Sequence, residues 1–177
     1  LAIEAEYVNQ PAKTIETNGN ALSLYADEID FAAGASVSET GAVILAPLTD
    51  ALPVDIQTAE AAGRLDITAT DLLAFAGATH SSLTIGKNAG TGVITLASAL
   101  ETDLPPLVFE GDDGTADLIQ INAALGSATA GQDITFKAPV LLAANVTTEG
   151  GAITFEQAVN IGANVVIDTT ESGTDAA

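Results

Sequence analysis

The chain of 177 residues contains no cysteine, no methionine and no tryptophan. The lack of cysteine excludes a scaffold held by disulfide bonds and is compatible with both the cytosol and the bacterial exterior. Aromatic residues make up only 4% of the chain, although 47% of it is hydrophobic. Alanine, valine, isoleucine and leucine therefore have to fill the interior, and a globally disordered chain is excluded.

Basic residues are also scarce, since four lysines and arginines face 24 acidic residues and give a formal charge of −20. Nucleic acids and anionic membranes need a basic surface, so the composition argues against both as partners. No apolar run approaches the roughly 20 residues that cross a bilayer, and no segment of the sequence has the pattern expected of a signal peptide. Because the chain opens on Leu1 inside a strand-like segment, we interpret it as a processed product or a piece of a larger protein.

A repeat with an offset of 19 residues occupies the last fifty residues. The matching segments are 131–136 with 150–155, Pro139-Val140 with Ala158-Val159, and Ala144–Val146 with Ala163–Val165. A period near 20 with short strands and glycine turns is typical of a β-solenoid, in which each repeat is one coil stacked on the previous one.

Short segments that alternate apolar and polar residues recur along the whole chain and predict strands. The clearest are Leu22–Leu24, Ile29–Phe31, Val43–Leu45, Leu65–Ile67, Leu83–Ile85, Ile94–Leu96, Ile119–Ile121, Ile134–Phe136 and Ile153–Phe155. The spacings are 21 (22 to 43), 18 (65 to 83), 19 (134 to 153) and 40 (94 to 134), the last of which we assign to two coils. We therefore predict an all-β fold, a single right-handed parallel β-helix over residues 1–177, with about 18–21 residues per coil, about eight coils and a frayed polar tail at 168–177.

Two stretches depart from this pattern. Residues Thr70–Phe75 combine a capping residue with an apolar run and predict a short helical turn. Residues Leu104–Leu107 contain two prolines, which cannot donate ladder hydrogen bonds, so a loop is expected there.

An ordered string of segments resembles the repeat region of filamentous haemagglutinin-like adhesins, which are large bacterial surface proteins. The segments are Gly41–Pro47, Asp55-Ile56, Leu65–Leu72, Ser82–Gly86 and Gly92–Leu96. The resemblance covers roughly residues 20–170 and implies a right-handed parallel β-helix, secretion, and a role in surface adhesion or extracellular matrix. The family's amino-terminal secretion domain has no counterpart in this chain.

The densest group of carboxylates on a glycine-containing turn is Asp112, Asp113 and Asp117. Calcium prefers six to eight oxygen ligands, so these three residues are the candidate metal ligands. The spacing differs from that of an EF-hand loop, and a solvated acidic turn is the alternative. Calcium is the one cofactor considered, and no catalytic residue is assigned.

Three further features have structural and functional interpretations. Thr84, Thr95, Thr135 and Thr154 are expected to point outward, either as a ladder for ice or glycan or as ordinary strand residues. Asn145 and Asn164 occupy equivalent repeat positions and predict an asparagine ladder between coils. The lone histidine, His80, is interpreted as a surface residue.

These observations favour a non-catalytic, extracellular or cell-surface segment, a rigid stalk that presents weak binding surfaces to a surface glycan or a protein receptor. Two alternatives remain open. The chain ends, near Leu1–Ile3 and Val165–Ile167, carry no polar cap, which is compatible with self-association of filament or matrix subunits through the solenoid ends. Parallel β-helices also include carbohydrate-active enzymes, which would need two carboxylates within reach of one bond.

Overall fold

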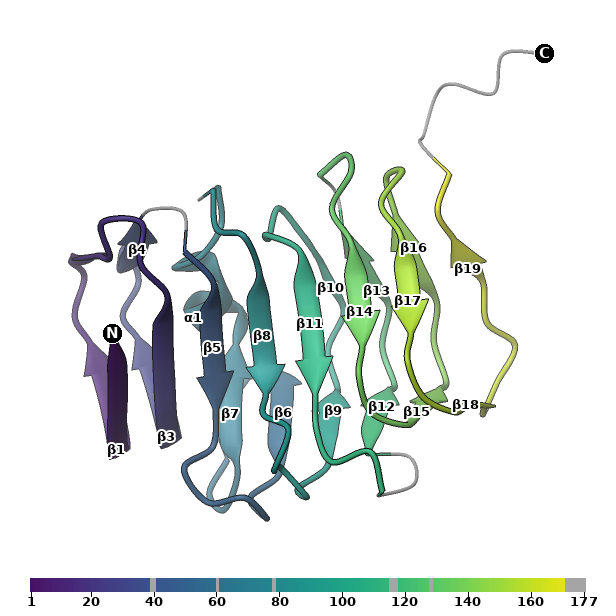
Figure 1. Cartoon of the computed structure of the whole chain (residues 1–177), viewed down its shortest axis with the longest axis horizontal. Helices are drawn as coiled ribbons and strands as arrows, with labels where there is room; N and C mark the ends of the chain where they lie inside the picture. Colours follow the sequence, from purple (N-terminus) through teal and green to yellow (C-terminus); the bar gives the residue numbers. More distant parts are fainter. Residues whose placement is uncertain (39–40, 60, 78, 115–117, 128, 171–177) are drawn as a thin grey trace.

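The chain folds as a parallel β-solenoid in the computed structural model, which describes residues 1–38, 41–59, 61–77, 79–114, 118–127 and 129–170. Figure 1 shows the coils side by side along one axis, from β1 at one end to β17, β18 and β19 at the other. Within the described residues there are 19 strands and one short helix, and all the pairings between strands are parallel. The predicted all-β solenoid is thereby confirmed.

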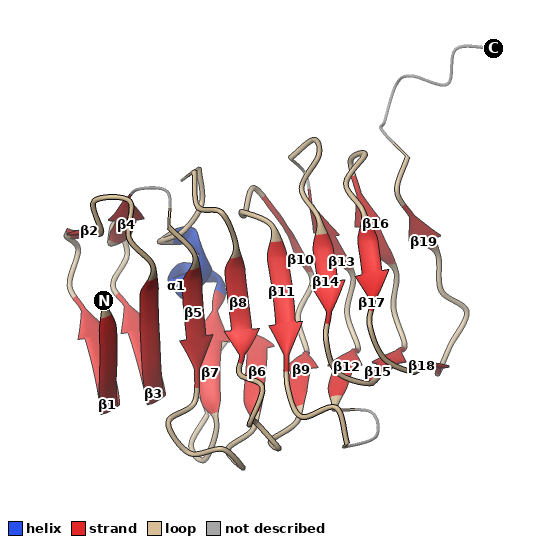
Figure 2. Ribbon diagram, in the orientation of Figure 1, coloured by secondary structure: helices blue, strands red, loops and turns tan. Residues whose placement is uncertain are grey.

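Three sheets run along the column, and a small one flanks its start (Figure 2). The first sheet consists of β1 (Ala2–Gln10), β3 (Leu22–Phe31), β5 (Val43–Ala46), β8 (Leu83–Gly86), β11 (Leu107–Glu110), β14 (Ile134–Phe136) and β17 (Ile153–Phe155). The second consists of β7 (Leu65–Thr68), β6 (Val54–Gln57), β9 (Ile94–Leu96), β12 (Ile119–Ile121), β15 (Val140–Leu142) and β18 (Val159–Ile161). The third consists of β10 (Leu100–Thr102), β13 (Leu125–Ser127), β16 (Val146–Thr148) and β19 (Ile167–Asp168). The small sheet pairs β2 (Thr14–Glu16) with β4 (Ser36–Ser38).

The column has about seven turns of about 21 residues instead of the expected eight. The register pairs Ala2 with Ser23 and Leu22 with Val43, which are intervals of 21 residues, whereas Val43 pairs with Leu83 across 40 residues. The observed number of coils differs from the predicted number because two of the spacings compared strands of different sheets. Residues 65 and 94 lie in the second sheet, whereas residues 83 and 134 lie in the first, so these spacings do not measure whole coils.

The core consists of inward-facing residues stacked in rows, one residue per coil. One row runs through β3, β5, β8, β11, β14 and β17 and contains Leu24, Leu45, Ile85, Phe109, Phe136 and Phe155. In this row the ring of Phe136 stacks between Phe109 and Phe155, with centroid distances of 5.3 and 4.9 Å. Each fully buried side chain of this size contributes about 1.5–3 kcal/mol, so the rows hold the coils together.

The 40-residue coil carries an additional strand and the helix. The chain leaves β6 at Gln57, and β7 begins at Leu65 and pairs in parallel with β6. Helix α1 (Ala69–Leu73) follows and begins at the N-cap Thr68, whose side chain accepts a hydrogen bond from the backbone N–H of Asp71. The predicted helical turn is confirmed, with the cap two residues earlier than Thr70. The loop expected at Leu104–Leu107 is present at Leu104–Pro106, and Leu107 already belongs to β11.

Asp71 attaches this helix to the preceding coil. It is 2% exposed, and its carboxylate accepts hydrogen bonds from the backbone N–H of Phe31 (2.7 Å), from the backbone N–H of Thr68 (2.7 Å) and from the hydroxyl of Thr68 (2.6 Å). The backbone N–H of Val37 then donates to the carbonyl of Ala74 at 2.8 Å. The helical segment therefore closes the side of the column between β4 and the third sheet.

Replacement of Asp71 by alanine is expected to lower the free energy of unfolding by about 2–4 kcal/mol, because it leaves buried donors without acceptors and removes the cap. Urea unfolding followed by circular dichroism measures the loss. Leu73→Ala is the matched control on the same helix, since Leu73 is 63% exposed. Equal stabilities of the two variants would contradict the anchoring role of Asp71.

Candidate functional site

The turn predicted to bind calcium lies after β11. The backbone N–H of Asp112 donates to the carbonyl of Gly90 at 2.8 Å, and the N–H of Gly114 donates to Oδ1 of Asp112 at 3.2 Å. Asp113 belongs to the same turn, whereas Asp117 lies outside the described residues. Across the part of the chain that the structure describes, no three acidic, histidine or cysteine side chains are grouped to hold a metal ion. The calcium site therefore stays a prediction.

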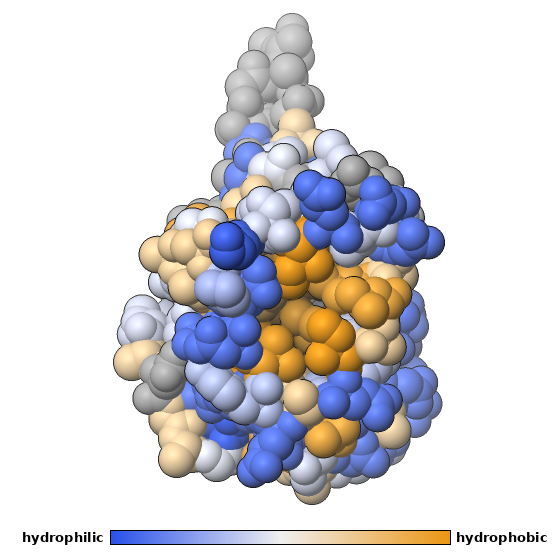
Figure 3. All heavy atoms as spheres, turned by 90° about the vertical axis from the view of Figure 1, so that its left-hand side faces the viewer, coloured by the Kyte–Doolittle hydropathy of each residue, from blue (hydrophilic) through white to orange (hydrophobic). Residues whose placement is uncertain are grey.

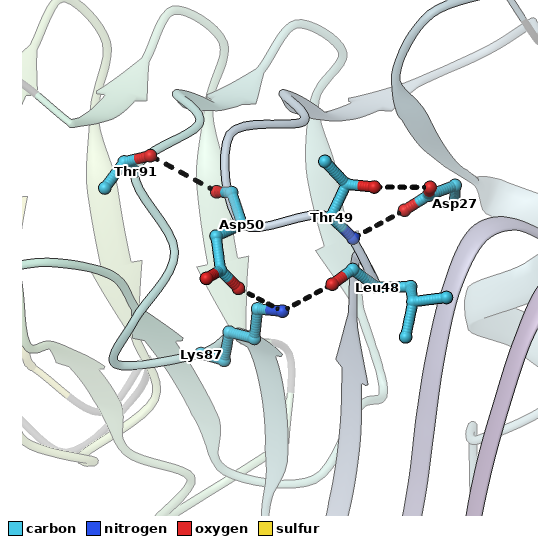
Figure 4. Close-up of polar contacts among 6 residues, drawn as sticks. All are labelled: Asp27, Leu48, Thr49, Asp50, Lys87 and Thr91. Atoms are coloured by element: carbon cyan, nitrogen blue, oxygen red, sulfur yellow. Dashed lines mark hydrogen bonds and ion pairs between the residues drawn. The ribbon is translucent and has the colours of Figure 1, made fainter.

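A cluster of polar contacts connects three successive coils at one edge of the column (Figure 4). The carboxylate of Asp27 in β3 accepts hydrogen bonds from the backbone N–H (2.9 Å) and the hydroxyl (2.7 Å) of Thr49 in the next coil. In the coil after that, Nζ of Lys87 lies 2.6 Å from Oδ1 of Asp50 and donates to the carbonyl of Leu48 at 3.0 Å. These groups satisfy one another, which indicates that the cluster fastens turns together.

The basic residues take part in such contacts within the fold. Besides Lys87, Lys137 lies 3.6 Å from Glu110, and Arg64 forms an ion pair with Asp55. Lys87 also lies over the ring of Tyr25, 5.9 Å from its centroid. Because three of the four basic side chains are engaged with carboxylates or carbonyls, the exposed surface carries the excess of negative charge. Such a surface repels anionic ligands.

Two buried aspartates on the second sheet were not singled out from the sequence. Asp55 of β6 and Asp66 of β7 are direct neighbours across the parallel pair and are 7% and 0% exposed. Asp55 pairs with Arg64, while Asp66 accepts hydrogen bonds from Nε2 of Gln57 (2.6 Å) and from the backbone N–H of Ala61. Ala61 and Arg64, which lie between the two strands, contact these carboxylates. The two aspartates therefore hold this connection in place and are closed to a substrate.

The four threonines do not form one continuous ladder. Thr84, Thr135 and Thr154 share a row on the first sheet, but Val108 interrupts it between Thr84 and Thr135. Thr95 belongs to the second sheet, where it lies between Asp55 and Gln120. Since Thr84 is only 8% exposed, this row offers no regular flat surface to a ligand. The general preference of β-branched residues for strands accounts for its threonines.

The predicted asparagine ladder is wrong. The register pairs Val146 with Ile167, so Asn145 lies opposite Val166 and not opposite Asn164. Oδ1 of Asn145 accepts a hydrogen bond from the backbone N–H of Val166 at 2.9 Å. The shift arises because the connection from β18 to β19, between Ile161 and Ile167, is two residues longer than the connection from β15 to β16 in the preceding coil, between Leu142 and Val146.

The expectation that His80 lies on the surface is also wrong. Its side chain is buried, only 5% exposed, and its ring lies edge-on to Phe75 with 6.1 Å between centroids. Both ring nitrogens are shielded from solvent without a hydrogen-bond partner. Sequence context placed this residue in a polar turn, whereas burial depends on the helical segment that packs beside it.

The end of the column at β19 has one titratable group with a shifted pKa. Hydrogen bonds from the backbone N–H (2.9 Å) and the hydroxyl (2.7 Å) of Thr170 lower the pKa of Asp168. Asp168 pairs with Thr147 in the third sheet, so residue 168 belongs to the column, contrary to the expectation that the frayed tail starts there. Residues 171–177 lie outside the described residues.

Comparison of the chain with protein-family models, with curated proteins and with solved structures gives no match. The described part of the chain contains no helix long and apolar enough to cross a membrane.

Proposed function

We propose that this chain is a non-catalytic, rigid segment of a bacterial extracellular surface protein of the filamentous haemagglutinin-like kind. The observation that carries the proposal is the seven-stranded parallel sheet, whose inward rows continue from coil to coil. A column of this kind is stiff along its axis, because bending it would strain backbone hydrogen bonds and stacked side chains together. It holds binding surfaces at a distance from the cell.

The polar contacts support a structural role. Asp27, Asp66 and Asp71 bind backbone groups or side chains of neighbouring segments. Each of these carboxylates is thus used to fasten coils or loops. Binding would then come from many weak contacts along the outer faces, which add by multivalency.

The net charge of −20 narrows the class of partner. A surface glycan without acidic groups, or a protein receptor with a basic face, fits this surface, whereas nucleic acids and anionic polysaccharides are repelled. A right-handed coil is part of this proposal, because parallel crossovers have that hand in about 98% of cases.

The location is tested by immunogold labelling of the bacteria that make the protein, with antibodies raised against the purified chain. Labelling of intact cells, and its loss after brief treatment with an external protease, is the expected result. Permeabilised cells serve as the control for antibody access. Labelling that requires permeabilisation would place the protein inside the cell and contradict the proposal.

Partner class is tested on an array of neutral, basic and acidic glycans at low and physiological ionic strength. Retention on neutral glycans and exclusion from acidic ones is expected because of the acidic surface. A reducing-sugar assay on the same neutral glycans separates binding from turnover. Release of reducing ends would favour the carbohydrate-active enzyme instead.

A further inference from the structure

A groove of about 460 Å³ lies where the chain enters β8, β11 and β14, three neighbouring strands of the first sheet. Its walls come from the segment after α1, from the proline loop before β11 and from the turn before β14. Figure 1 shows the chain entering these strands along the upper edge of the column. The groove thus lies in the middle of the column, and its volume is within the range of roughly 300–1,000 Å³ that is usual for small-molecule sites.

Hydrogen bonds between the three segments hold the walls of the groove in place. The backbone N–H of Gly77 donates to the carbonyl of Asp103 at 3.3 Å, and the backbone N–H of Leu83 donates to the carbonyl of Pro106 at 2.8 Å. The hydroxyl of Thr129, in the turn before β14, donates to Oδ1 of Asp103. Because the walls are already fixed, little conformational entropy is lost when a ligand binds between them.

Part of the groove lining is apolar. Seen from the β1 end, the strongly apolar residues gather at the centre of the column, with hydrophilic residues around them (Figure 3). In the groove, apolar residues reach the outer edge instead, since the lining includes Leu104 and Pro105, which are buried, and Pro106, which is half-buried. The proline rings have no N–H, so they offer an apolar surface on which the C–H groups of a ligand can pack.

The groove also contains polar side chains whose hydrogen-bonding capacity is not used within the described part of the chain. Oδ1 of Asp103 accepts from Thr129, whereas Oδ2 accepts no hydrogen bond from the described residues. The side-chain amide of Gln132 and the hydroxyl of Thr79, which line the groove as well, have no partner among these residues either. A carboxylate, an amide and a hydroxyl therefore remain available beside the apolar surface.

His80, the single histidine of the chain, lines the same groove. Its side chain is 5% exposed, and neither Nδ1 nor Nε2 has a hydrogen-bond partner among the described residues. A neutral imidazole has one donor and one acceptor nitrogen, so both capacities are unused. Buried polar groups without partners are rare in native proteins, and functional sites are where such exceptions are expected. The orphaned imidazole therefore indicates that the groove binds a ligand.

We propose that this groove binds a neutral saccharide. The hydroxyl groups of a sugar both donate and accept hydrogen bonds, which suits the carboxylate of Asp103, the amide of Gln132 and the imidazole of His80. The C–H groups of the sugar ring pack on Pro105 and Pro106. Because both nitrogens of His80 are shielded from solvent, binding includes a turn of the imidazole toward the groove. The site rests on the adhesive function proposed for the chain and narrows its partner to a neutral saccharide, since a net charge of −20 repels acidic ones.

The single histidine gives a direct test, because its imidazole produces one set of signals in proton–nitrogen correlation spectra. The isotope-labelled chain is titrated with the neutral probes cellotriose, maltotriose, xylotriose and triacetylchitotriose, and with sodium trigalacturonate as the acidic probe at the same pH. At least one neutral probe should shift the nitrogen signals of His80 in a saturable manner, and the acidic probe should leave them in place. Signals that no neutral probe moves, or that the acidic probe moves as far, would overturn the proposal.

Variants separate this groove from saccharide binding elsewhere on the column. His80→Phe keeps an aromatic ring beside Phe75 and removes the two unpaired nitrogens, so its urea midpoint should not fall below that of the unmodified chain. Its affinity for the trisaccharide that moved the signals should fall about tenfold, the effect of one lost hydrogen bond, as measured by isothermal titration calorimetry.

Gln132→Ala should lose affinity to a similar extent. Gln120→Ala is the matched control, because Gln120 is half-buried like Gln132 but lies on the outward face of the second sheet. It should bind as tightly as the unmodified chain. If His80→Phe and Gln132→Ala bound as tightly as this control, the saccharide would lie outside the groove, and the inference would be wrong while the adhesive function still stood.

Discussion

Replacement of Phe136 by alanine is expected to cost about 3–5 kcal/mol of unfolding free energy. The ring is fully buried and lies between two others, parallel to Phe109 within 11° and to Phe155 within 4°. Truncation removes the transfer free energy of the ring, leaves a cavity in the middle of a row and ends two stacking contacts, each worth about 0.5–1.5 kcal/mol. The loss of unfolding free energy is measured by urea denaturation, from the shift of the midpoint and the slope of the free energy with urea concentration.

Phe155→Ala is the comparison within the same row. Phe155 is only partly buried and has its stacking partner on one side, so its truncation should cost clearly less than that of Phe136. An equal cost at both positions, or a cost below about 1 kcal/mol at Phe136, would show that the rows do not hold the column as described.

Replacement of Gly86 by alanine is expected to lower the unfolding free energy by about 2–5 kcal/mol. Gly86 has a φ of +91°, and a Cβ added there would lie 2.2 Å from the carbonyl oxygen of Glu110 in the next coil and 2.7 Å from Cδ1 of Ile94. Backbone strain and the clash therefore add, because the carbonyl cannot move without disturbing the pairing of β8 with β11.

Gly63→Ala separates these two causes. Gly63 has a similar φ of +84°, but a Cβ there would meet nothing within 4 Å. Its substitution should cost only the roughly 1–2 kcal/mol of the left-handed backbone. If the two alanine variants were equally stable by urea unfolding, close packing between successive coils at Gly86 would be refuted.

The solenoid could be predicted from the sequence, because alternating apolar and polar residues show which side chains of a strand face inward, and the repeat shows which strands stack on one another. Leu22 and Val43, and likewise Ile134 and Ile153, are in register as the repeat indicates. Spacing alone does not tell which sheet a strand joins. The 18 residues between Leu65 and Leu83 therefore resembled one coil, although these residues lie in the second and the first sheet.

The candidate sites were harder to predict because they depend on which segments fold over a strand. Asp66 has the same alternating context as any outward strand residue, and its burial comes from the loop that precedes β7. His80 is buried through its contact with Phe75. The sequence did contain one signal for this pair of aspartates. Asp55 in Val-Asp-Ile and Asp66 in Leu-Asp-Ile each lie between two apolar strand residues, and the two strands are neighbours in the second sheet.

The stacking of coils is tested most directly by distances between spin labels along one outward row of the first sheet. The row contains Ser23, Ile44, Thr84, Val108, Thr135 and Thr154, one residue per coil. Labels at 23 and 154 should lie about 24 Å apart, and labels at 44 and 154 about 19 Å apart, a decrease of one strand spacing. Samples are diluted with unlabelled chain at low salt to remove contacts between copies. Distances that do not shorten by one spacing, or that exceed about 40 Å, would contradict a column in which each coil lies directly on the one before it.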